Sequence, residues 1–470
     1  MSANYYGHEF GRPRVGTETT GMMHFDEILR ADGGPPSATL QDRGVYRPRV
    51  VRIGYSRYTD PAQIQREIDG IWNKCWTVAA REEDIPNVGD MTRYDLVDTS
   101  YVIVRTAADT IKAFHNTCRH RGRLLCDGRM HADKFQCRFH GWTYNLDGSL
   151  AWVPSRQDFP NVKNEKYGLL EVRVERWGGN VFINPDPKSR PLSAALGVLA
   201  EHFKESPLED RYTALLMRKK IRANWKLTQE AFMEAYHMVE THWDALPFSG
   251  DANTLYDCWS ADNNDYCISR VLTPLGVPSP YLQDSVSAEQ ALQVFLRSMG
   301  FSGEAPTGED IGKLRAFAAD VRKQELSRMF GRSYAHLPAS QLIDAVKYFM
   351  FPNFHPWWGE GVPLWYRFLP NGRNPGECIM EVRLLLPVPA SGPRPPAAAP
   401  IEVDFEQRCS EIPELAFLGH IFDQDMGNIP FVQAGIKAAP RAFAAPTLAR
   451  SQEASITHFH EIYGRRLAAG

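Results

Sequence analysis

Two pairs of side chains that can bind metal lie close together in the first third of the chain. They are Cys118-x-His120 and Cys137-x-x-His140, with sixteen residues between the pairs. Two thiolates and two imidazoles can hold either a zinc ion or an iron–sulfur cluster. Structural zinc sites usually carry cysteines and histidines in like pairs, whereas each pair here is mixed. The mixed pairs therefore favour a [2Fe–2S] cluster with both cysteines on one iron and both histidines on the other.

Three further residues of metal-binding type lie near these pairs but outside the pattern. Cys126 falls between the pairs, and we expect it to be a buried free thiol. His115 and His131 are off the spacing, so we do not expect them to be ligands.

A second group of possible ligands lies in the helix-forming segment 223–244, which contains His237 and His242. Non-heme Fe(II) enzymes that activate O2 often use two histidines and one carboxylate on one side of the iron. Residues i and i+5 of a regular α-helix lie about 140° apart, so these two could not share an ion there. The helix must be widened or must end between them, and we predict an irregular helix near Met238–Thr241.

The surrounding pattern predicts three parts of the chain. Residues 1–72 form an arm followed by a helix that Asp60 and Pro61 open. Residues 73–187 hold short β-branched and aromatic runs separated by turns, which predict a small all-β domain. Residues 188–470 predict a larger α+β domain.

Several elements are expected in the larger part. Helices are expected at 191–205, 224–243, 287–299, 309–330, 406–417 and 452–467. Residues 363–388 predict a hairpin, and the Pro/Ala-rich segment 391–400 predicts a loop.

Composition limits the class of protein. The 470 residues are 43% hydrophobic and 23% charged, with a net charge of −3, which gives no reason to expect nucleic acid as a partner. No apolar run is long enough to span a membrane, and the N-terminus lacks a signal core. Eight cysteines are few for a disulfide scaffold, so we expect a cytoplasmic protein.

The first motif, with "RHRG" after its first cysteine and "HGW" at its second histidine, resembles the cluster-binding motif of Rieske non-heme iron oxygenases. The likeness is to the large (alpha, terminal oxygenase) subunit of the aromatic-ring-hydroxylating dioxygenase type. The second segment is similar to the mononuclear iron motif of the same family, and its matching positions are Asn224-Trp225-Lys226, Glu230, Glu234, Tyr236-His237 and His242. The resemblance implies that Cys118, His120, Cys137 and His140 hold a [2Fe–2S] Rieske cluster. It also implies that His237 and His242 bind a mononuclear Fe(II).

In the family the third iron ligand is an aspartate far downstream, on a helix that ends in a Gln-x-Gly-type pattern. Gln433 and Gly435 fit that pattern here, and Asp425 is the best match for the ligand. Asp423 and Asp244 remain alternatives.

The resemblance also places Glu234 and Asn224 in the catalytic machinery. The acidic residue before Tyr-His bridges the two metal centres in the family, so Glu234 would join His237 to His140 of another subunit. Most family members carry Asp at this position. Some that act on quaternary amines carry Glu, as this chain does.

The resemblance implies an α+β fold in which a small all-β Rieske domain is joined to a catalytic domain with a twisted antiparallel sheet covered by helices. It implies a head-to-tail homotrimer, to which small beta subunits are sometimes added. Electrons would come from NAD(P)H only indirectly, through a separate reductase or ferredoxin, because no nucleotide-binding glycine motif is visible here.

The implied activity is that of an O2-incorporating oxidoreductase. It would hydroxylate or dihydroxylate an aromatic or other apolar substrate, as in aromatic hydrocarbon catabolism. One alternative is a monooxygenase or N-demethylase of a quaternary ammonium compound. Others are a Rieske electron carrier without oxygenase activity and a zinc-bound structural protein.

The aromatic residues of segment 349–366 have two possible uses. They either fill the core under the sheet or line a pocket for an aromatic or quaternary ammonium substrate. They are Phe354, Trp357, Trp358, Trp365 and Tyr366.

Overall fold

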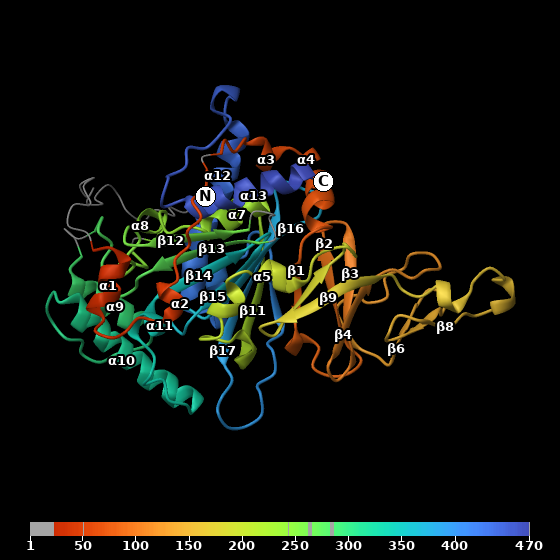
Figure 1. Ribbon diagram of the computed structural model, residues 1–470, viewed down its shortest axis with the longest axis horizontal. Coiled ribbons are helices and arrows are strands. Elements are labelled where there is room, and N and C mark those ends of the chain that lie inside the picture. The colour runs from red at the N-terminus through yellow and green to blue at the C-terminus, as the bar shows by residue number, and fades with distance from the viewer. Residues whose placement is uncertain (1–22, 50, 243, 262–265, 283–285, 470) are drawn as a thin grey trace.

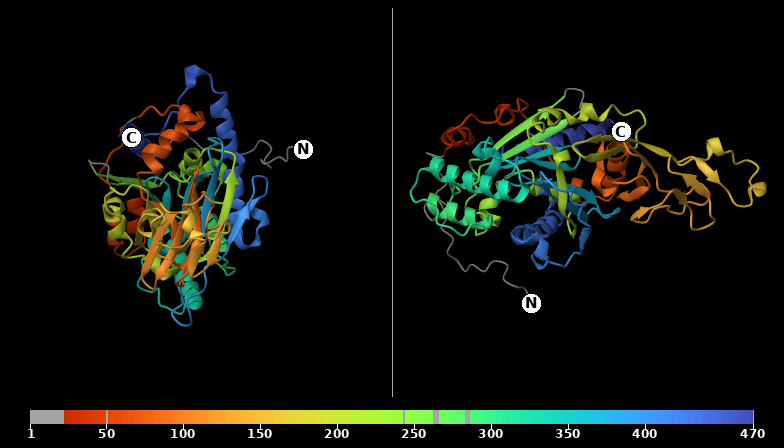
Figure 2. Two further views of the ribbon diagram at one scale, coloured as in Figure 1. Left: turned by 90° about the vertical axis from the view of Figure 1, so that its right-hand side faces the viewer. Right: turned by 90° about the horizontal axis from the view of Figure 1, so that it is seen from below.

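The computed structural model describes residues 23–49, 51–242, 244–261, 266–282 and 286–469. Part of the predicted N-terminal arm, residues 1–22, therefore lies outside the described residues. A smaller β-rich part lies at one end of the molecule, and a larger part with a long central sheet makes up the rest (Figures 1 and 2).

The smaller part contains two antiparallel sheets. Its strands are β1 (Thr77–Arg81), β2 (Asp90–Leu96), β3 (Thr99–Ala107), β4 (Thr110–His115), β5 (Arg129–His131), β6 (Lys134–Gln136), β7 (Thr143–Asn145), β8 (Leu150–Trp152), β9 (Glu171–Trp177) and β10 (Asn180–Asn184). Seven of them form a sheet in the order β1-β10-β9-β4-β3-β2-β5, and β6-β7-β8 form a second sheet. The second sheet projects away from the body of the molecule (Figure 1).

The larger part is built on one sheet of eight strands. These are β11 (Arg211–Ile221), β12 (Leu255–Ser260), β13 (Cys267–Thr273), β14 (Ala345–Met350), β15 (Phe354–Trp358), β16 (Leu364–Pro370), β17 (Cys378–Pro387) and β18 (Pro400–Val403). Their order is β12-β13-β14-β15-β16-β17-β11-β18, and every neighbouring pair is antiparallel except β11 and β18.

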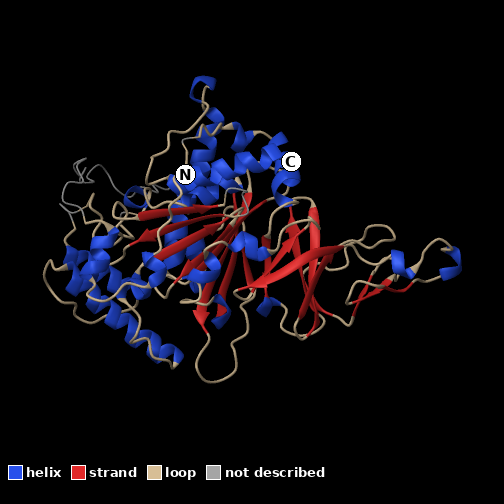
Figure 3. Cartoon of the chain, in the orientation of Figure 1, coloured by secondary structure: helices blue, strands red, loops and turns tan. Residues whose placement is uncertain are grey.

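Helices cover both faces of this sheet, as Figure 3 shows. They are α1 (Phe25–Ala31), α2 (Ala38–Gln41), α3 (Ser56–Thr59), α4 (Ala62–Glu67), α5 (Leu192–Leu196), α6 (Leu199–His202), α7 (Trp225–Ala231), α8 (Met238–Thr241), α9 (Ala288–Ser298), α10 (Ile311–Phe330), α11 (Ala339–Ile343), α12 (Phe417–Ala438) and α13 (Ala454–Ala469). Helices α7, α12 and α13 share a core with one face, which we call the helix-α7 face. Helices α1, α2, α5 and α6 share a core with the other face, and α9 to α11 form a third core beside the sheet. The predicted α+β class is confirmed.

Successive side chains of a strand point to opposite faces of the sheet, so a residue's position along the strand decides which of the two cores its side chain joins. On β16, Leu364, Tyr366 and Phe368 pack on the helix-α7 face, whereas Trp365 packs on the opposite face. Both faces are buried, so this sheet has no solvent side.

Buried polar contacts join the smaller part to the central sheet. Arg383 of β17 donates to Asp84, which follows β1, over 2.9 Å, and each side chain is only 2% exposed. Glu83 accepts from the backbone N–H of Thr213 on β11 over 3.0 Å. The two parts are therefore held in one fixed arrangement.

Most of the predicted helices of the larger part are present. Helices α9, α10 and α13 lie within or close to the predicted ranges. The helix opened at Asp60 and Pro61 is α4, and it continues as a π-helical turn to Trp72. The helix predicted at 191–205 is divided into α5 and α6 at Gly197, which has a positive φ of 47°.

Two helix predictions are wrong in extent. The helix predicted at 224–243 stops at Ala231, because the Glu234 carboxylate accepts the backbone N–H of His237 and holds the chain in a turn. The helix predicted at 406–417 is replaced by two short 3-10 turns. Pro413 has no N–H to donate within a helix, so an α-helix through this segment is disfavoured.

The predicted hairpin at 363–388 is confirmed as β16 and β17, and residues 391–399 form a loop before β18. Among the described residues, no helix is long and apolar enough to cross a membrane.

Candidate metal centres

Two loops of the smaller part carry the four predicted cluster ligands, and they have the same local construction. Cys118 and His120 follow β4, whereas Cys137 and His140 follow β6. In the first loop Gly122 N–H donates to the Cys118 carbonyl over 2.9 Å, and in the second Gly141 N–H donates to the Cys137 carbonyl over 2.8 Å. Both glycines have positive φ, at 78° and 73°, which the tight closure of each loop requires.

The two loops bring their side chains together. The imidazoles of His120 and His140 have ring centroids 4.7 Å apart. Cys118 and Cys137 are 2% and 3% exposed, whereas His140 is exposed. Burial raises the pKa of the Cys118 thiol, and the neighbouring Cys137 thiol adds to the rise. Two adjacent buried thiols with two imidazoles at the outer edge fit the donor set of a [2Fe–2S] cluster.

Aromatic side chains enclose this donor set. The ring of His120 stacks on Trp142, with centroids 5.1 Å apart and planes 5° from parallel. The hydroxyl of Tyr144 accepts from the Arg119 backbone N–H over 3.0 Å and lies 3.5 Å from the sulfur of Cys118. Since that hydroxyl already accepts one bond, its proton is free to be donated to the sulfur.

The residues that fall outside the motif have other contacts. The Cys126 thiol donates to the Gly128 carbonyl over 3.1 Å. His131 lies 2.8 Å from a carboxylate oxygen of Asp90, and His115 packs against the ring of Tyr101. These contacts support the expectation that the three are not ligands.

The second group of ligands is placed by a break in the helix. Helix α7 begins at Asn224, whose side chain accepts from Lys226 N–H as an N-cap, and ends at Ala231. The single turn α8 then lies between His237 and His242. The predicted irregularity is present, but it begins upstream of Met238–Thr241 rather than within it.

Asp425 of α12 meets both histidines. Its Oδ1 lies 3.2 Å from Nε2 of His242 and 3.6 Å from Nε2 of His237. One ligand atom from each of the three residues lies within 4.8 Å of the others. Two imidazoles and one carboxylate on one side of a shared point fit a mononuclear Fe(II) with open positions.

Each histidine is oriented by a side-chain oxygen that lies at hydrogen-bond distance from its Nδ1 atom, the ring nitrogen that faces away from Asp425. Glu234 Oε1 lies 2.6 Å from Nδ1 of His237, and Gln424 Oε1 lies 2.9 Å from Nδ1 of His242. Such partners fix the tautomer and leave Nε2 available to a metal. The role of Gln424 could not be expected from the sequence, because nothing in its residue type or spacing distinguishes it beside Asp425.

The alternative carboxylates have other roles. Asp423 accepts from the backbone N–H groups of Cys409 and Ser410 over 2.7 and 3.2 Å, so it fastens α12 to the preceding segment. Asp244 accepts from the Gln424 amide over 2.7 Å. Of the three aspartates, Asp425 is the one that the structure groups with the histidines.

Asn224 occupies a structural position. Besides capping α7, its amide donates to the carbonyls of Pro375 and Tyr58 over 2.8 and 3.2 Å. Its backbone N–H donates to Gln433 Oε1 over 2.9 Å, which ties α12 to the start of α7. These contacts support a positioning role rather than the catalytic role that the resemblance implied.

The five aromatic residues of segment 349–366 divide between the two faces of the sheet. Phe354, Trp358 and Trp365 pack in the core opposite the metal ligands, so for them the expectation of a pocket role is not supported. Trp357 and Tyr366 lie on the helix-α7 face, with ring centroids 5.6 Å apart.

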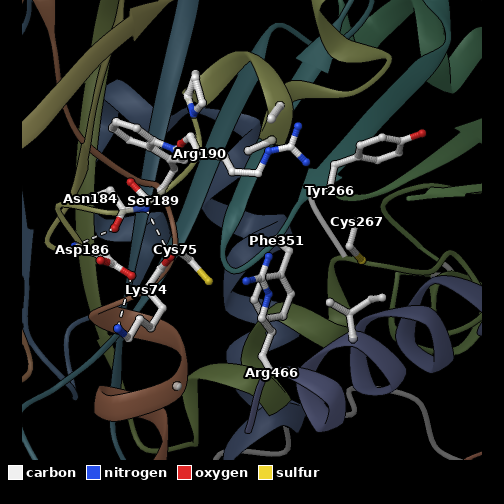
Figure 4. A pocket seen from close by; sticks show the side chains of 16 residues that line it. Lys74, Cys75, Asn184, Asp186, Ser189, Arg190, Tyr266, Cys267, Phe351 and Arg466 are labelled. Atoms are coloured by element: carbon white, nitrogen blue, oxygen red, sulfur yellow. Dashed lines mark hydrogen bonds and ion pairs between the residues drawn. The ribbon is translucent and has the colours of Figure 1, made fainter. Parts of the chain in front are cut away.

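Two cavities lie near these elements. A cavity of about 520 Å³ borders the second group of ligands, and its lining includes Glu234, His237 and Asp425. Another, of about 390 Å³, is shown in Figure 4, and none of the predicted ligands lines it. Its polar groups bind one another, as in the ion pair of Lys74 with Asp186 over 3.2 Å, which indicates a structural cleft.

Comparison with known families gives two matches along the chain. Residues 75–164 match the Rieske [2Fe–2S] domain, and residues 201–469 match the catalytic domain of the ring hydroxylating alpha subunit. The chain belongs to the ring hydroxylating alpha subunit family. Membership confirms the two predicted cofactor types, a Rieske [2Fe–2S] cluster and a mononuclear iron.

Two curated relatives of this alpha subunit have names that give different substrates. The carnitine monooxygenase oxygenase subunit of Escherichia coli (strain K12) is 31% identical over 39% of this chain and 50% of its own length. The biphenyl 2,3-dioxygenase subunit alpha of Rhodococcus jostii (strain RHA1) is 34% identical over 41% of this chain and 44% of its own length. The alpha subunit described here thus spans about half the length of the curated relatives that it matches.

Solved structures show the same fold at low identity. A quaternary ammonium Rieske monooxygenase in complex with L-carnitine has a TM-score of 0.59 at 17% identity, over 88% of this chain and 95% of that one. Naphthalene 1,2-dioxygenase with indole bound has a TM-score of 0.61 at 19% identity, over 89% of this chain and 92% of that one. These likenesses support the fold.

Proposed function

We propose that this alpha subunit is the terminal oxygenase component of a Rieske oxygenase system. Its substrate is an aromatic or other apolar organic molecule, which it hydroxylates or dihydroxylates. The observation that carries the proposal is the grouping of His237, His242 and Asp425, with their ligand atoms within 4.8 Å of one another, in a chain that also has a Rieske domain.

Each cofactor has a proposed set of ligands. Cys118, His120, Cys137 and His140 would hold the cluster, and His237, His242 and Asp425 would hold the iron. When bound, the cluster supplies electrons one at a time and the iron activates O2.

The surrounding residues orient the ligands and limit access to them. Glu234 and Gln424 each hold a proton at Nδ1 of a histidine, so that Nε2 of both rings faces Asp425. His242 and Asp425 are 2% and 3% exposed, so water reaches this centre chiefly from the side of His237.

We also propose a head-to-tail homotrimer in which Glu234 of one subunit meets His140 of the next. Support comes from the shape of the chain. The β6-β7-β8 sheet beside His140 projects from one end of the molecule, while α8 and α12 lie over the central sheet (Figures 1 and 2). The separation of the β6-β7-β8 sheet from α8 and α12 supports electron transfer between neighbouring subunits, and a ring of identical subunits provides such a contact.

The proposed oxygenase function also requires protein partners that supply electrons. Family members act with a reductase or ferredoxin, and we propose that NAD(P)H serves this alpha subunit only through such a protein. Beta subunits are compatible with this scheme. All eight cysteines are free and buried, which supports a reducing, cytoplasmic setting.

Quaternary ammonium oxidation is a second candidate function. Glu234 occupies the bridging position, and curated relatives include the carnitine monooxygenase oxygenase subunit. Several acidic residues line the 520 Å³ cavity, which would suit a cation; they are Glu230, Glu234, Glu240 and Glu453.

The proposed activity can be tested on the full chain purified with its iron. We expect the EPR signal of a reduced Rieske cluster and substrate-dependent O2 uptake with a chemical reductant or a generic reductase. His242→Ala should abolish uptake and leave the EPR signal unchanged, because it removes only an iron ligand. An intact EPR signal without uptake on any aromatic acid, arene or quaternary amine would instead indicate an electron carrier.

The bridging role of Glu234 has its own test. Glu234→Gln should leave both cofactors bound while electron transfer between the centres stops, because the neutral amide alters the hydrogen bond to His237. Near-normal turnover by this variant would refute the bridge.

A further inference from the structure

One half-buried lysine on the helix-α7 face of the sheet has an environment unlike that of the fully buried lysines. Lys347 lies in the middle of β14, between Val346 and Tyr348, which pack on the opposite face. Alternation therefore directs Lys347 to the same face as Phe349, toward α7 and α12.

The fully buried lysines have hydrogen-bond acceptors. Lys226 donates to Glu67 over 2.5 Å, and Lys219 donates to the carbonyls of Asp404 and Gln407 over 2.6 and 2.7 Å. Lys347 makes no hydrogen bond or ion pair with any residue that the structure describes. Lys347 is half-buried. An ammonium partly shielded from water and without an acceptor is unfavourable, so an acceptor from outside the chain would stabilise it.

Aromatic rings surround this ammonium. Its nitrogen lies 5.5 Å from the ring centroid of Trp357 and 6.0 Å from that of Phe232. Trp357 is also the cross-strand neighbour of Lys347, and its indole N–H has no acceptor among the described residues. Tyr366 packs against both rings, with centroids 5.6 and 5.3 Å away. The result is an apolar enclosure with two unused donors.

The enclosure adjoins the proposed iron centre. Phe232 precedes Glu234 by two residues on the segment that leads to His237. Burial lowers the pKa of Lys347 to about 8, although the nearby carboxylates of Glu234 and Asp425 oppose that change. The side chain thus remains mainly protonated at pH 7.

Charge balance leaves this ammonium uncompensated. With a ferrous ion bound, the carboxylates of Glu234 and Asp425 would match its two positive charges, and both histidines would be neutral as ligands. The positive charge of Lys347 is then the one in this enclosure that neither carboxylate balances.

We propose that Lys347 binds the anionic group of the substrate, and that the substrate is an aromatic molecule bearing a carboxylate. This inference rests on the proposed oxygenase function and specifies the substrate class of the same site. Phe232, Trp357 and Tyr366 enclose the ring of such a substrate, and the Trp357 indole N–H is a second donor for its carboxylate.

The same arrangement disfavours a quaternary ammonium substrate. A second cation beside Lys347 would be repelled in a site shielded from water. Of the acidic residues that line the 520 Å³ cavity, Glu234 and Asp425 lie near Lys347, and both are assigned to the proposed iron centre. Glu230 there is already bonded to Tyr58 and His460 over 3.0 and 2.7 Å.

The test measures ligand binding to the iron-loaded protein by calorimetry without O2. The probes are benzoate and 2-naphthoate, the matched neutral amides benzamide and 2-naphthamide, and the cation phenyltrimethylammonium. We expect at least one carboxylate to bind roughly tenfold or more tightly than its amide, since hydrogen bonds to charged groups are the stronger ones. The cation should bind more weakly than either.

Three variants assign the effect to Lys347. Lys347→Met removes the charge at similar length and should weaken carboxylate binding roughly ten- to a hundredfold, with amide binding changed less than about threefold. Lys347→Arg keeps the charge and should retain the preference. Lys112→Met removes a partly exposed charge from β4 and should change nothing.

Each possible result decides the question. The proposal is overturned if no carboxylate binds more tightly than its amide, if none binds at all, or if Lys347→Met leaves the preference intact. Iron content, the Rieske EPR signal and O2 uptake are measured on the same samples. Uptake with neutral or cationic substrates alone would refute the anion site and leave the oxygenase function standing.

Discussion

Removal of the Gln424 amide is expected to weaken the proposed iron centre without touching a ligand. The Gln424 oxygen lies 2.9 Å from Nδ1 of His242, which is only 2% exposed. Gln424→Leu keeps the approximate volume but leaves that N–H without an acceptor, and water cannot easily replace it. An unsatisfied buried donor costs about 1–3 kcal/mol, which corresponds to about 5- to 150-fold in an equilibrium constant.

The loss should fall mainly on the metal-bound state, because a metal-free His242 ring can turn to find another acceptor. Removing such partners of metal-bound histidines usually costs about 10- to 100-fold in affinity. We therefore expect Gln424→Leu to lower Fe(II) or Co(II) affinity by that factor, measured by competition with a chelating dye. The Rieske EPR signal should not change.

Gln424→Glu is the matched control, since a carboxylate still offers an oxygen to His242. Its metal affinity should stay within a few-fold of the parent chain. If the Leu variant also binds metal within about twofold of the parent, then either His242 does not depend on this amide or it is not a ligand.

The remaining predictions concern the junction of the two parts and the cluster. Arg383→Met should lower the free energy of unfolding by about 1.5–3 kcal/mol in a denaturant titration, because buried Asp84 loses one of its two arginine partners and keeps only Arg129; a loss below about 1 kcal/mol would contradict this. Burial raises the pKa values of Asp84 and Glu83, but their arginine neighbours outweigh it and hold both below the usual range. The stability that these carboxylates add is complete above their unfolded pKa of about 4 and should be lost as pH falls below it, which unfolding curves from pH 7 to pH 3 would reveal. Tyr144→Phe should lower the reduction potential of the cluster in a redox titration, because it removes a hydroxyl 3.5 Å from the Cys118 sulfur; an unchanged potential would show that no hydrogen bond is made.

Local spacing was enough to predict some features of this chain. The Cys/His pairs lie on two short loops, each closed by its own backbone bonds, so the sequence near each pair contains the whole local structure. The prediction of an irregular helix between His237 and His242 likewise followed from helix geometry alone. The start of that irregularity was missed because it depends on Glu234 bonding to a backbone N–H, which competes with the helix.

Other features depend on contacts between distant segments. Asp425 was found through family resemblance, since nothing local connects α12 to His242. Gln424 and Lys347 were missed for a related reason. A lysine in an alternating strand suggests a solvent-facing position, yet both faces of this sheet are covered. For the same reason, periodicity could not separate Trp357, which lies on the helix-α7 face, from Trp358, which packs on the other face.

The buried junction between the two sheets also has a consequence for protein engineering. Asp84 and Arg383 lie 299 residues apart in the chain, but they form one ion pair that water does not reach. A chimera that took only its Rieske domain from a relative without an acidic residue at this position would leave Arg383 without this partner. Recombination should therefore succeed when the two halves of the junction are exchanged together or already match.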